Sequence, residues 1–133
     1  MSVNEPGGRG LLDTSVFIAR EQERPLGSLP DSAAISVITL AELHLGVLLA
    51  DEPDVRARRL QTLSVVQQTF QPLPIDEEVA RVFAVIVAQA RRLGRRPRVM
   101  DTWIAATAVA HRLPVYSQDV DFQSIPQAEV VLV

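Results

Sequence analysis

Five acidic residues of this 133-residue chain lie where a strand is expected to end or a helix to run: Asp13, Glu42, Asp101, Asp119 and Asp121. Carboxylates that a fold brings together repel one another, so their pKa values rise unless a cation neutralises them. Carboxylate oxygens suit Mg²⁺ and Mn²⁺, and such ions can activate water and hold a phosphodiester for in-line displacement. A cluster of these acids would therefore indicate metal-dependent phosphoryl chemistry.

Each acid also has a purely structural interpretation. Asp13 follows the apolar pair at 11–12, and Asp119 and Asp121 follow an apolar run at 115–116, where turn-forming or capping Asp is common. Asp101 could simply complement the dipole in the first turn of a helix. It shares a helical face with Ile104, Ala105 and Ala108.

Glu42 is the acid whose surroundings are most ambiguous. Thr39 and Glu42 have the spacing of a capping box, which would place both at the start of a helix. Glu42 also shares a helical face with Leu45, Gly46 and Leu49, so it is predicted to point toward apolar neighbours. A carboxylate in such a place needs a partner or an ion.

Missing residue types exclude several other kinds of chemistry. All 13 basic residues are Arg, so the chain offers neither the Lys of a P-loop nor an amine for Schiff-base chemistry. There is no Cys, which excludes disulfides and thiolate metal sites. Two His, His44 and His111, offer little for an imidazole zinc site or a Ser-His-Asp triad.

The elements that must position the acids alternate along the chain. Helical patterns occupy 14–21, 39–50, 54–70, 76–92 and 99–112, and strand patterns occupy 11–12, 33–37, 71–75, 114–117 and 129–133. This alternation predicts an α/β fold, a three-layer α/β/α sandwich with a mainly parallel central sheet. In such folds, sites lie beyond the carboxyl ends of the strands.

Length and composition predict one domain. With 47% hydrophobic and 22% charged residues, the chain has the composition of a globular protein. We expect residues 1–9, polar and rich in Gly, to form a flexible lead-in and residues 10–133 to form the domain. The sequence has no apolar signal region and no stretch of about 20 apolar residues, so a cytoplasmic protein without membrane contact is expected.

Three segments closely resemble one known family. They are LLDTSVFIA at 11–19, ISVITLAELHLGVLLA at 35–50 and DTWIAATAVAHRLPVYSQDVDF at 101–122. They resemble PIN-domain proteins, specifically the VapC-type toxins of bacterial toxin–antitoxin pairs. The resemblance covers about 11–133 and is weakest over 50–70.

The resemblance implies an endoribonuclease that depends on Mg²⁺ or Mn²⁺. Its implied catalytic residues are Asp13, Glu42, Asp101 and Asp119. Of these, Asp13, Asp101 and Asp119 are the implied metal ligands, with Glu42 and Asp121 as further candidates. Three hydroxyl residues, Thr14, Ser15 and Ser117, match positions that can support the ligands through hydrogen bonds, although Thr14 and Ser15 could instead cap the first helix.

The resemblance also implies partners. They are a second copy in a homodimer, an RNA substrate, and a VapB-type antitoxin whose tail covers the acidic site. The helices predicted within 39–70 are candidate surfaces for the two protein partners.

A basic segment before Asp101 is the candidate RNA path. It contains Arg91, Arg92, Arg95, Arg96 and Arg98, and its arginines can bind phosphates, although a solvated helix end is an equally simple interpretation. The net charge is −3, but four of the 16 acids are candidate site residues, which leaves 12 acids against 13 Arg. Trp103 and Tyr116 are predicted to lie in the core rather than to stack on bases.

Two other functions compete with the ribonuclease. Phosphotransfer domains of the receiver or haloacid-dehalogenase type also place Asp after a strand, but both use a Lys that this chain lacks. A non-catalytic α/β module that binds RNA or protein is the remaining alternative, and the acids at every expected motif argue against it.

Overall fold

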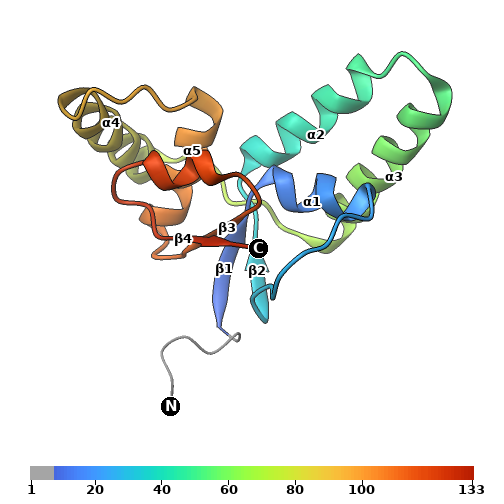
Figure 1. Cartoon of the computed structure of the whole chain (residues 1–133), viewed down its shortest axis with the longest axis horizontal. Helices are drawn as coiled ribbons and strands as arrows, with labels where there is room; N and C mark the ends of the chain where they lie inside the picture. The colour runs from blue at the N-terminus through green and yellow to red at the C-terminus, as the bar shows by residue number, and fades with distance from the viewer. Residues whose placement is uncertain (1–7) are drawn as a thin grey trace.

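The computed structural model describes residues 8–133 as a parallel sheet flanked by helices (Figure 1). The strands are β1 (Arg9–Leu12), β2 (Ser32–Ala34), β3 (Val115–Ser117) and β4 (Val130–Leu132), in the order β2-β1-β3-β4. The helices are α1 (Thr14–Glu21), α2 (Val37–Leu49), α3 (Pro53–Thr69), α4 (Glu77–Arg92) and α5 (Val99–Ala110), followed by a short 3₁₀ helix, η1 (Val120–Ser124). The predicted fold class is confirmed.

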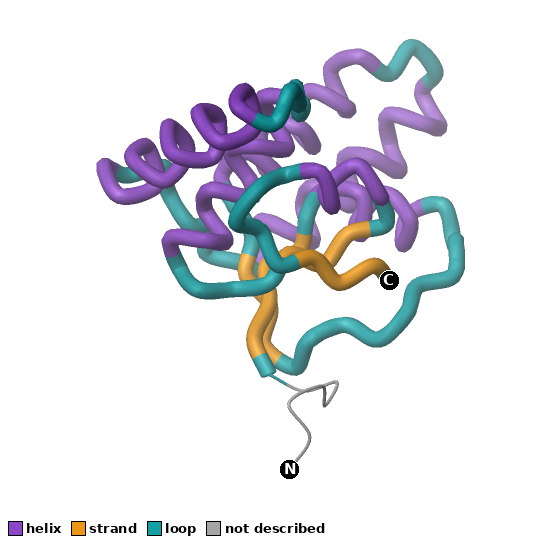
Figure 2. The backbone as a smooth tube through the Cα atoms, turned by 60° about the vertical axis from the view of Figure 1, so that its left-hand side comes forward, coloured by secondary structure: helices purple, strands orange, loops and turns teal. Residues whose placement is uncertain are grey.

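The core divides into two parts because successive strand residues point to opposite faces of the sheet. Leu11 packs against apolar residues of α4 and α5, whereas Leu12 packs against residues of α1, α2 and α3. Val115 and Tyr116 of β3 alternate in the same way. The result is three layers, with α4 and α5 on one side of the sheet and α1 and the α2–α3 hairpin on the other (Figures 1 and 2).

The strand order places a switch of direction beside β1. From β1 the chain passes to β2 on one side, and β3 and β4 later pair on the other side. In parallel sheets a crevice forms at the carboxyl ends of the two strands that flank such a switch. Asp13 and Gln118 immediately follow β1 and β3 at this place.

The strand predicted at 33–37 is wrong in its second half. The hydroxyl of Ser36 accepts a hydrogen bond from the backbone N–H of Ile38 at 3.0 Å and caps α2, so this helix begins at Val37. Thr39 and Glu42 are therefore inside the helix, and the capping box proposed for them is also wrong. An earlier, stronger cap determines the start of the helix.

The strand predicted at 71–75 is only a single bridge between Ser36 and Leu73. Leu73 donates to the carbonyl of Ile35 at 2.8 Å and accepts from Val37 at 3.0 Å. The pairing does not extend further along this segment, because α2 begins at Val37 and the extended partner ends there.

Of the lead-in predicted over 1–9, residues 1–7 lie outside the described part of the chain, and Arg9 already belongs to β1. None of the helices described over residues 8–133 combines the length and the hydropathy that a membrane span requires.

Two glycines allow a test of this packing. A Cβ added at Gly10 in β1 would overlap the ring of Tyr116 in β3, whereas a Cβ at Gly46 in α2 has only the Arg59 side chain nearby, at 3.8 Å. Gly10→Ala should lower the free energy of unfolding by about 1–3 kcal/mol. Gly46→Ala should raise it by about 0.5–1 kcal/mol, because Ala is the better helix former. Urea unfolding followed by circular dichroism measures both, and equal effects of the two variants would contradict the packing described for β1.

Candidate functional site

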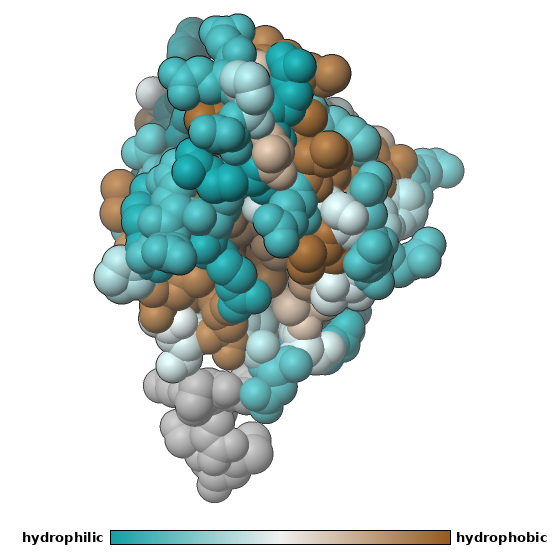
Figure 3. Space-filling view, turned by 90° about the vertical axis from the view of Figure 1, so that its right-hand side faces the viewer, coloured by the Kyte–Doolittle hydropathy of each residue, from teal (hydrophilic) through white to brown (hydrophobic). Residues whose placement is uncertain are grey.

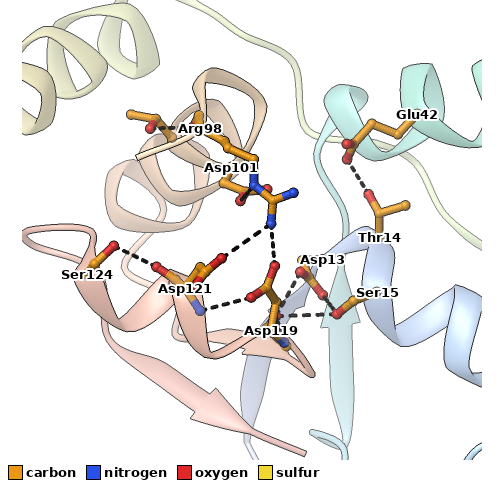
Figure 4. Close-up of polar contacts among 11 residues, drawn as sticks. Asp13, Thr14, Ser15, Glu42, Arg98, Asp101, Asp119, Asp121 and Ser124 are labelled. Carbon is orange, nitrogen blue, oxygen red and sulfur yellow. Dashed lines mark hydrogen bonds and ion pairs between the residues drawn. The ribbon is translucent and has the colours of Figure 1, made fainter. Parts of the chain in front are cut away.

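Asp13 is the most enclosed acid of the site. Asp13 directly follows β1 and is only 3% exposed. Its backbone N–H donates to the carbonyl of Tyr116 at 3.1 Å. Ser15 Oγ donates to Oδ1 at 2.6 Å (Figure 4). Ser117 Oγ donates to Oδ2 at 2.8 Å. Hydroxyls from the start of α1 and the end of β3 thus hold the two carboxylate oxygens.

Burial has a clear electrostatic effect on this carboxylate. The pKa of Asp13 is raised to about 6, mainly because burial removes water from the carboxylate. Hydrogen bonds from Ser15 and Ser117 oppose this rise, and the nearby charge of Asp101 contributes to it. A group with such a pKa changes charge near neutral pH and gains from a nearby cation.

Glu42 reaches the site from α2. Thr14 Oγ1 at the start of α1 donates to Glu42 Oε1 at 2.5 Å, and Figure 4 shows this pair beside the Asp13 cluster. Two of the apolar residues predicted to share its face lie on the surface, since Leu45 is 52% exposed and Leu49 is 66% exposed. The side chain of Glu42 is held by Thr14 of α1.

Asp101 lies in the first turn of α5, and the residues predicted to share its face, Ile104, Ala105 and Ala108, are all buried. Burial raises the pKa of Asp101, and the Arg98 charge opposes this rise. The charges of Glu42, Asp119 and Asp121 then add to the rise. The fold therefore brings acids from α2, α5 and the segment after β3 close enough to affect one another.

Asp119 and Asp121 differ in how far they are enclosed. The Asp119 side chain is 29% exposed, and its backbone N–H donates to Ser117 Oγ at 2.9 Å. Its Oδ1 accepts from the backbone N–H of Asp121 at 2.9 Å and so caps η1. The Asp121 side chain is 71% exposed. Asp119 therefore stabilises the start of η1 through Oδ1 and lies among the other acids at the same time.

Thr14, Ser15 and Ser117 all bond to side chains of the site. Neither Thr14 nor Ser15 caps α1, whose first residue follows Asp13 without any side-chain cap. The capping alternative for these two residues is wrong. Ser15 Oγ also accepts from the backbone N–H of Gln118 at 2.9 Å, which ties α1 to the end of β3.

Arg98 lies among the acids, which the sequence did not lead us to expect. Its Nη2 is 2.6 Å from Asp119 Oδ2, its Nε is 3.2 Å from Asp101 Oδ2, and its Nη2 is 3.7 Å from Asp121 Oδ2 (Figure 4). Asp101, and then Asp119, raise the pKa of this guanidinium. The i,i+3 spacing of Arg98 and Asp101 was the one available signal, because it brings side chains together on a helix.

A cavity of about 230 Å³ opens beside this cluster, lined by the 96–98 segment together with Asp101, Asp121, Ser124 and Ile125. Within residues 8–133, no three acidic or His side chains stand close enough to hold an ion in this conformation. The donors are nonetheless all oxygen atoms, and a guanidinium lies among three of the carboxylates as a stand-in cation. In their chemistry the residues therefore suit a hard divalent ion.

The remaining arginines of the basic segment, Arg91, Arg92, Arg95 and Arg96, are all exposed. Arg95 donates to the carbonyl of Ser124 at 3.1 Å, which places it at the rim of the same cavity. The two aromatic residues predicted to lie in the core are not free for bases. Tyr116 is buried, and the half-buried Trp103 stacks on Phe83 with ring centroids 3.7 Å apart.

Comparison with known proteins gives consistent matches over most of the chain. The PIN domain model matches residues 10–128. Ribonuclease VapC5 of Mycobacterium tuberculosis is 47% identical over 124 residues, covering 92% of this chain and 91% of the relative. Ribonuclease VapC4 of the same organism is 45% identical over 130 residues, covering 94% of this chain and 97% of the relative.

A solved structure agrees with these relatives. A chain in the crystal structure of the VapBC-5 toxin–antitoxin system from Mycobacterium tuberculosis has a TM-score of 0.82 and 44% identity, covering 94% of this chain and 97% of that one. The PIN domain match over residues 10–128 spans the switch point of the sheet and the positions of all five acids. This chain belongs to the PIN domain family, and within it to the VapC ribonucleases of toxin–antitoxin systems.

Proposed function

We propose that this toxin is an endoribonuclease that depends on Mg²⁺ or Mn²⁺ and hydrolyses RNA phosphodiester bonds at the acid cluster. The observation that carries the proposal is the burial of the Asp13 carboxylate near Asp101 at the switch point of the sheet, where loss of water and the charge of Asp101 both raise the pKa of Asp13. Such an arrangement of carboxylates lowers the stability of the fold unless a cation binds beside them. The ribonuclease names of the relatives support the same reaction.

Asp13, Asp101 and Asp119 would hold the ion, with Glu42 and Asp121 as the outer acids. A bound divalent ion supplies Lewis-acid stabilisation of the phosphate and lowers the pKa of water. Ser15 and Ser117 keep both oxygens of Asp13 fixed, so that the carboxylate does not have to be ordered when substrate arrives. Glu42, held by Thr14, is positioned to accept a proton or orient the attacking water.

Arg91, Arg92, Arg95 and Arg96 would bind phosphates of the RNA strand on either side of the scissile bond. The side chains of these arginines are exposed, and Arg96 lines the acidic cavity itself, so the segment would attract the RNA backbone toward the site.

A VapB-type antitoxin and a second copy of the chain are the proposed protein partners. The structure matched above is that of a VapBC pair. Apolar side chains stand exposed on α2 and α3 and interrupt the polar surface of the face seen in Figure 3. They are Leu45, Leu48, Leu49, Leu60 and Val65, and exposed apolar groups of this kind are typical of protein contacts.

We infer that residues 10–133 act as one domain in the cytoplasm.

Removal of the central ligands should abolish cleavage. Purified protein with Mg²⁺ or Mn²⁺ should cut a pool of structured cellular RNAs at discrete sites. Asp13→Ala, Asp101→Ala and EDTA should each reduce the rate by at least about 100-fold, because each removes charge stabilisation from the reacting phosphate. Sequencing of the product ends measures cleavage, and circular dichroism checks that the variants fold. Unchanged cleavage by a folded Asp13→Ala variant would place the metal centre elsewhere, and the absence of both cleavage and metal binding in the wild type would favour a non-catalytic module.

The raised pKa of Asp13 predicts how stability depends on pH in the metal-free protein. As the pH rises from about 4 to about 6, the unfolded chain loses the Asp13 proton while the folded chain keeps it, so the fold loses stability. Relative to Asp13→Asn, which cannot ionise, the wild type should lose roughly 3 kcal/mol between about pH 4 and 7. Urea unfolding in EDTA at several pH values measures this difference. A difference that does not change with pH would mean that burial does not raise the pKa.

The proposed RNA path predicts a change in salt dependence. The Arg95→Gln/Arg96→Gln double variant should reduce the slope of log K against log salt for RNA binding by about 1.4, because each phosphate contact on single-stranded RNA contributes about 0.7. Binding is measured in EDTA to prevent cleavage. Arg81→Gln is the control, because Arg81 is also an exposed arginine but pairs with Glu78 on α4. A slope equal to that of the wild type would mean that Arg95 and Arg96 are only solvated ends of α4.

A further inference from the structure

Arg98 occupies the position where the acids converge. It bonds to Asp101 and Asp119 at 3.2 and 2.6 Å, and a third carboxylate, that of Asp121, lies 3.7 Å away. Only a group with several donors can serve carboxylates from α5 and from η1 at once. The planar guanidinium does so because its donors are spread over three nitrogens, whereas the three donors of an ammonium are on one nitrogen.

These contacts occur at the same carboxylates that the ribonuclease needs as ligands. A divalent ion binds ionised carboxylate oxygens, and Asp101 Oδ2 and Asp119 Oδ2 are both taken by Arg98. Two cations cannot share these oxygens at ligand distances without strong repulsion. Binding of an ion and retention of the Arg98 contacts are therefore alternatives.

We propose that Arg98 is the internal counter-ion of the metal centre: it neutralises Asp101 and Asp119 in the metal-free protein, and it must release them before a divalent ion can bind. This proposal depends on the metal-dependent function proposed above. Arg98 is a positioning residue in this sense, because it determines when the ligands become available and opposes weak or partial occupation of the site.

The structure shows how Arg98 can withdraw at little cost. Its side chain is 66% exposed, and ion pairs of exposed side chains are individually weak. Its backbone, in contrast, is fixed, because the carbonyl accepts from the N–H of Thr102 at 2.9 Å and from Thr102 Oγ1 at 2.8 Å. Only side-chain rotations are then needed, with no change to the start of α5.

The released guanidinium would remain beside the cavity lined by Arg96, Asp101 and Asp121. A phosphate placed there matches the two parallel donors of Arg98 as well as the carboxylates did. We therefore expect Arg98 to exchange carboxylate for RNA phosphate when ion and substrate bind. The exchange distinguishes Arg98 from Arg95 and Arg96, which have no acidic partner in the structure as described over residues 8–133.

The test is the affinity of the full chain for Mn²⁺, measured by isothermal titration at pH 7.5 after removal of metal with EDTA. Arg98→Gln removes the competing cation, so we expect Mn²⁺ to bind about 5-fold more tightly than to the wild type. Arg98→Lys, which keeps a charge but loses the fork, should lie between the two. The matched control is Arg81→Gln, which removes an exposed arginine paired at the same 2.6 Å distance to Glu78, outside the site. This control should bind Mn²⁺ with the affinity of the wild type.

Thermal unfolding provides a second, independent test of the role of Arg98. Without metal, Arg98→Gln leaves the acids without their counter-ion, so its melting temperature should fall below that of the wild type. Saturating Mn²⁺ should restore most of the loss, because the ion replaces the missing positive charge. For Arg81→Gln, the metal-induced shift should equal that of the wild type.

The outcomes separate this proposal from the ribonuclease function. If Arg98→Gln folds but binds Mn²⁺ with the same affinity as the wild type or more weakly, Arg98 is an ordinary ion pair and the proposal is overturned while the metal centre stands. If neither the wild type nor Arg98→Gln binds Mn²⁺, both proposals fail.

Discussion

The buried carboxylate of Asp13 is the group on which the rest of this site depends. A carboxylate that is 3% exposed loses most of its hydration, and the protein compensates with hydroxyls from Ser15 and Ser117 on opposite oxygens. The compensation is incomplete, since the pKa remains about 6. The part of the lost hydration that these two hydrogen bonds do not replace makes a nearby cation favourable. The strand order supplies the geometry, because Asp13 and Ser117 come together only where β1 and β3 are neighbours.

The same electrostatic conflict explains why acids and a single arginine occur together. Asp101 is partly buried and is surrounded by the charges of Glu42, Asp119 and Asp121, which destabilise its ionised form. A protein selected only for stability would replace such a cluster with apolar residues. Under the proposed function the cluster is retained because a metal centre needs negative charge at this point, and the ion pairs of Arg98 offset part of the repulsion. Stability and the proposed activity would then make opposite demands on the same few side chains.

Local sequence patterns predicted most of the helices and strands, but they could not predict contacts between residues that are far apart in the sequence. The helix that carries Asp101 was predictable because its small buried residues recur at helical spacing. The start of α2 was missed because Ser36 and Thr39 can both cap, and only packing decides between them. The acids were predicted to gather, since parallel strands end at one edge. The pairing of Arg98 with Asp119 was not predictable, because a long side chain can reach many partners and 21 residues separate the two.

The bond between Ser117 and Asp13 has a consequence for synthesis of the chain. It joins residues 104 positions apart, and β1 has no partner on its β3 side until the segment around Val115 has been made. Contacts so distant in sequence form late, both in refolding and as a chain leaves the ribosome. The N-terminal portion can therefore carry the full Asp13 motif and yet lack a rigid carboxylate. The Asp13 carboxylate can therefore become rigid only after the segment around Ser117 has been translated.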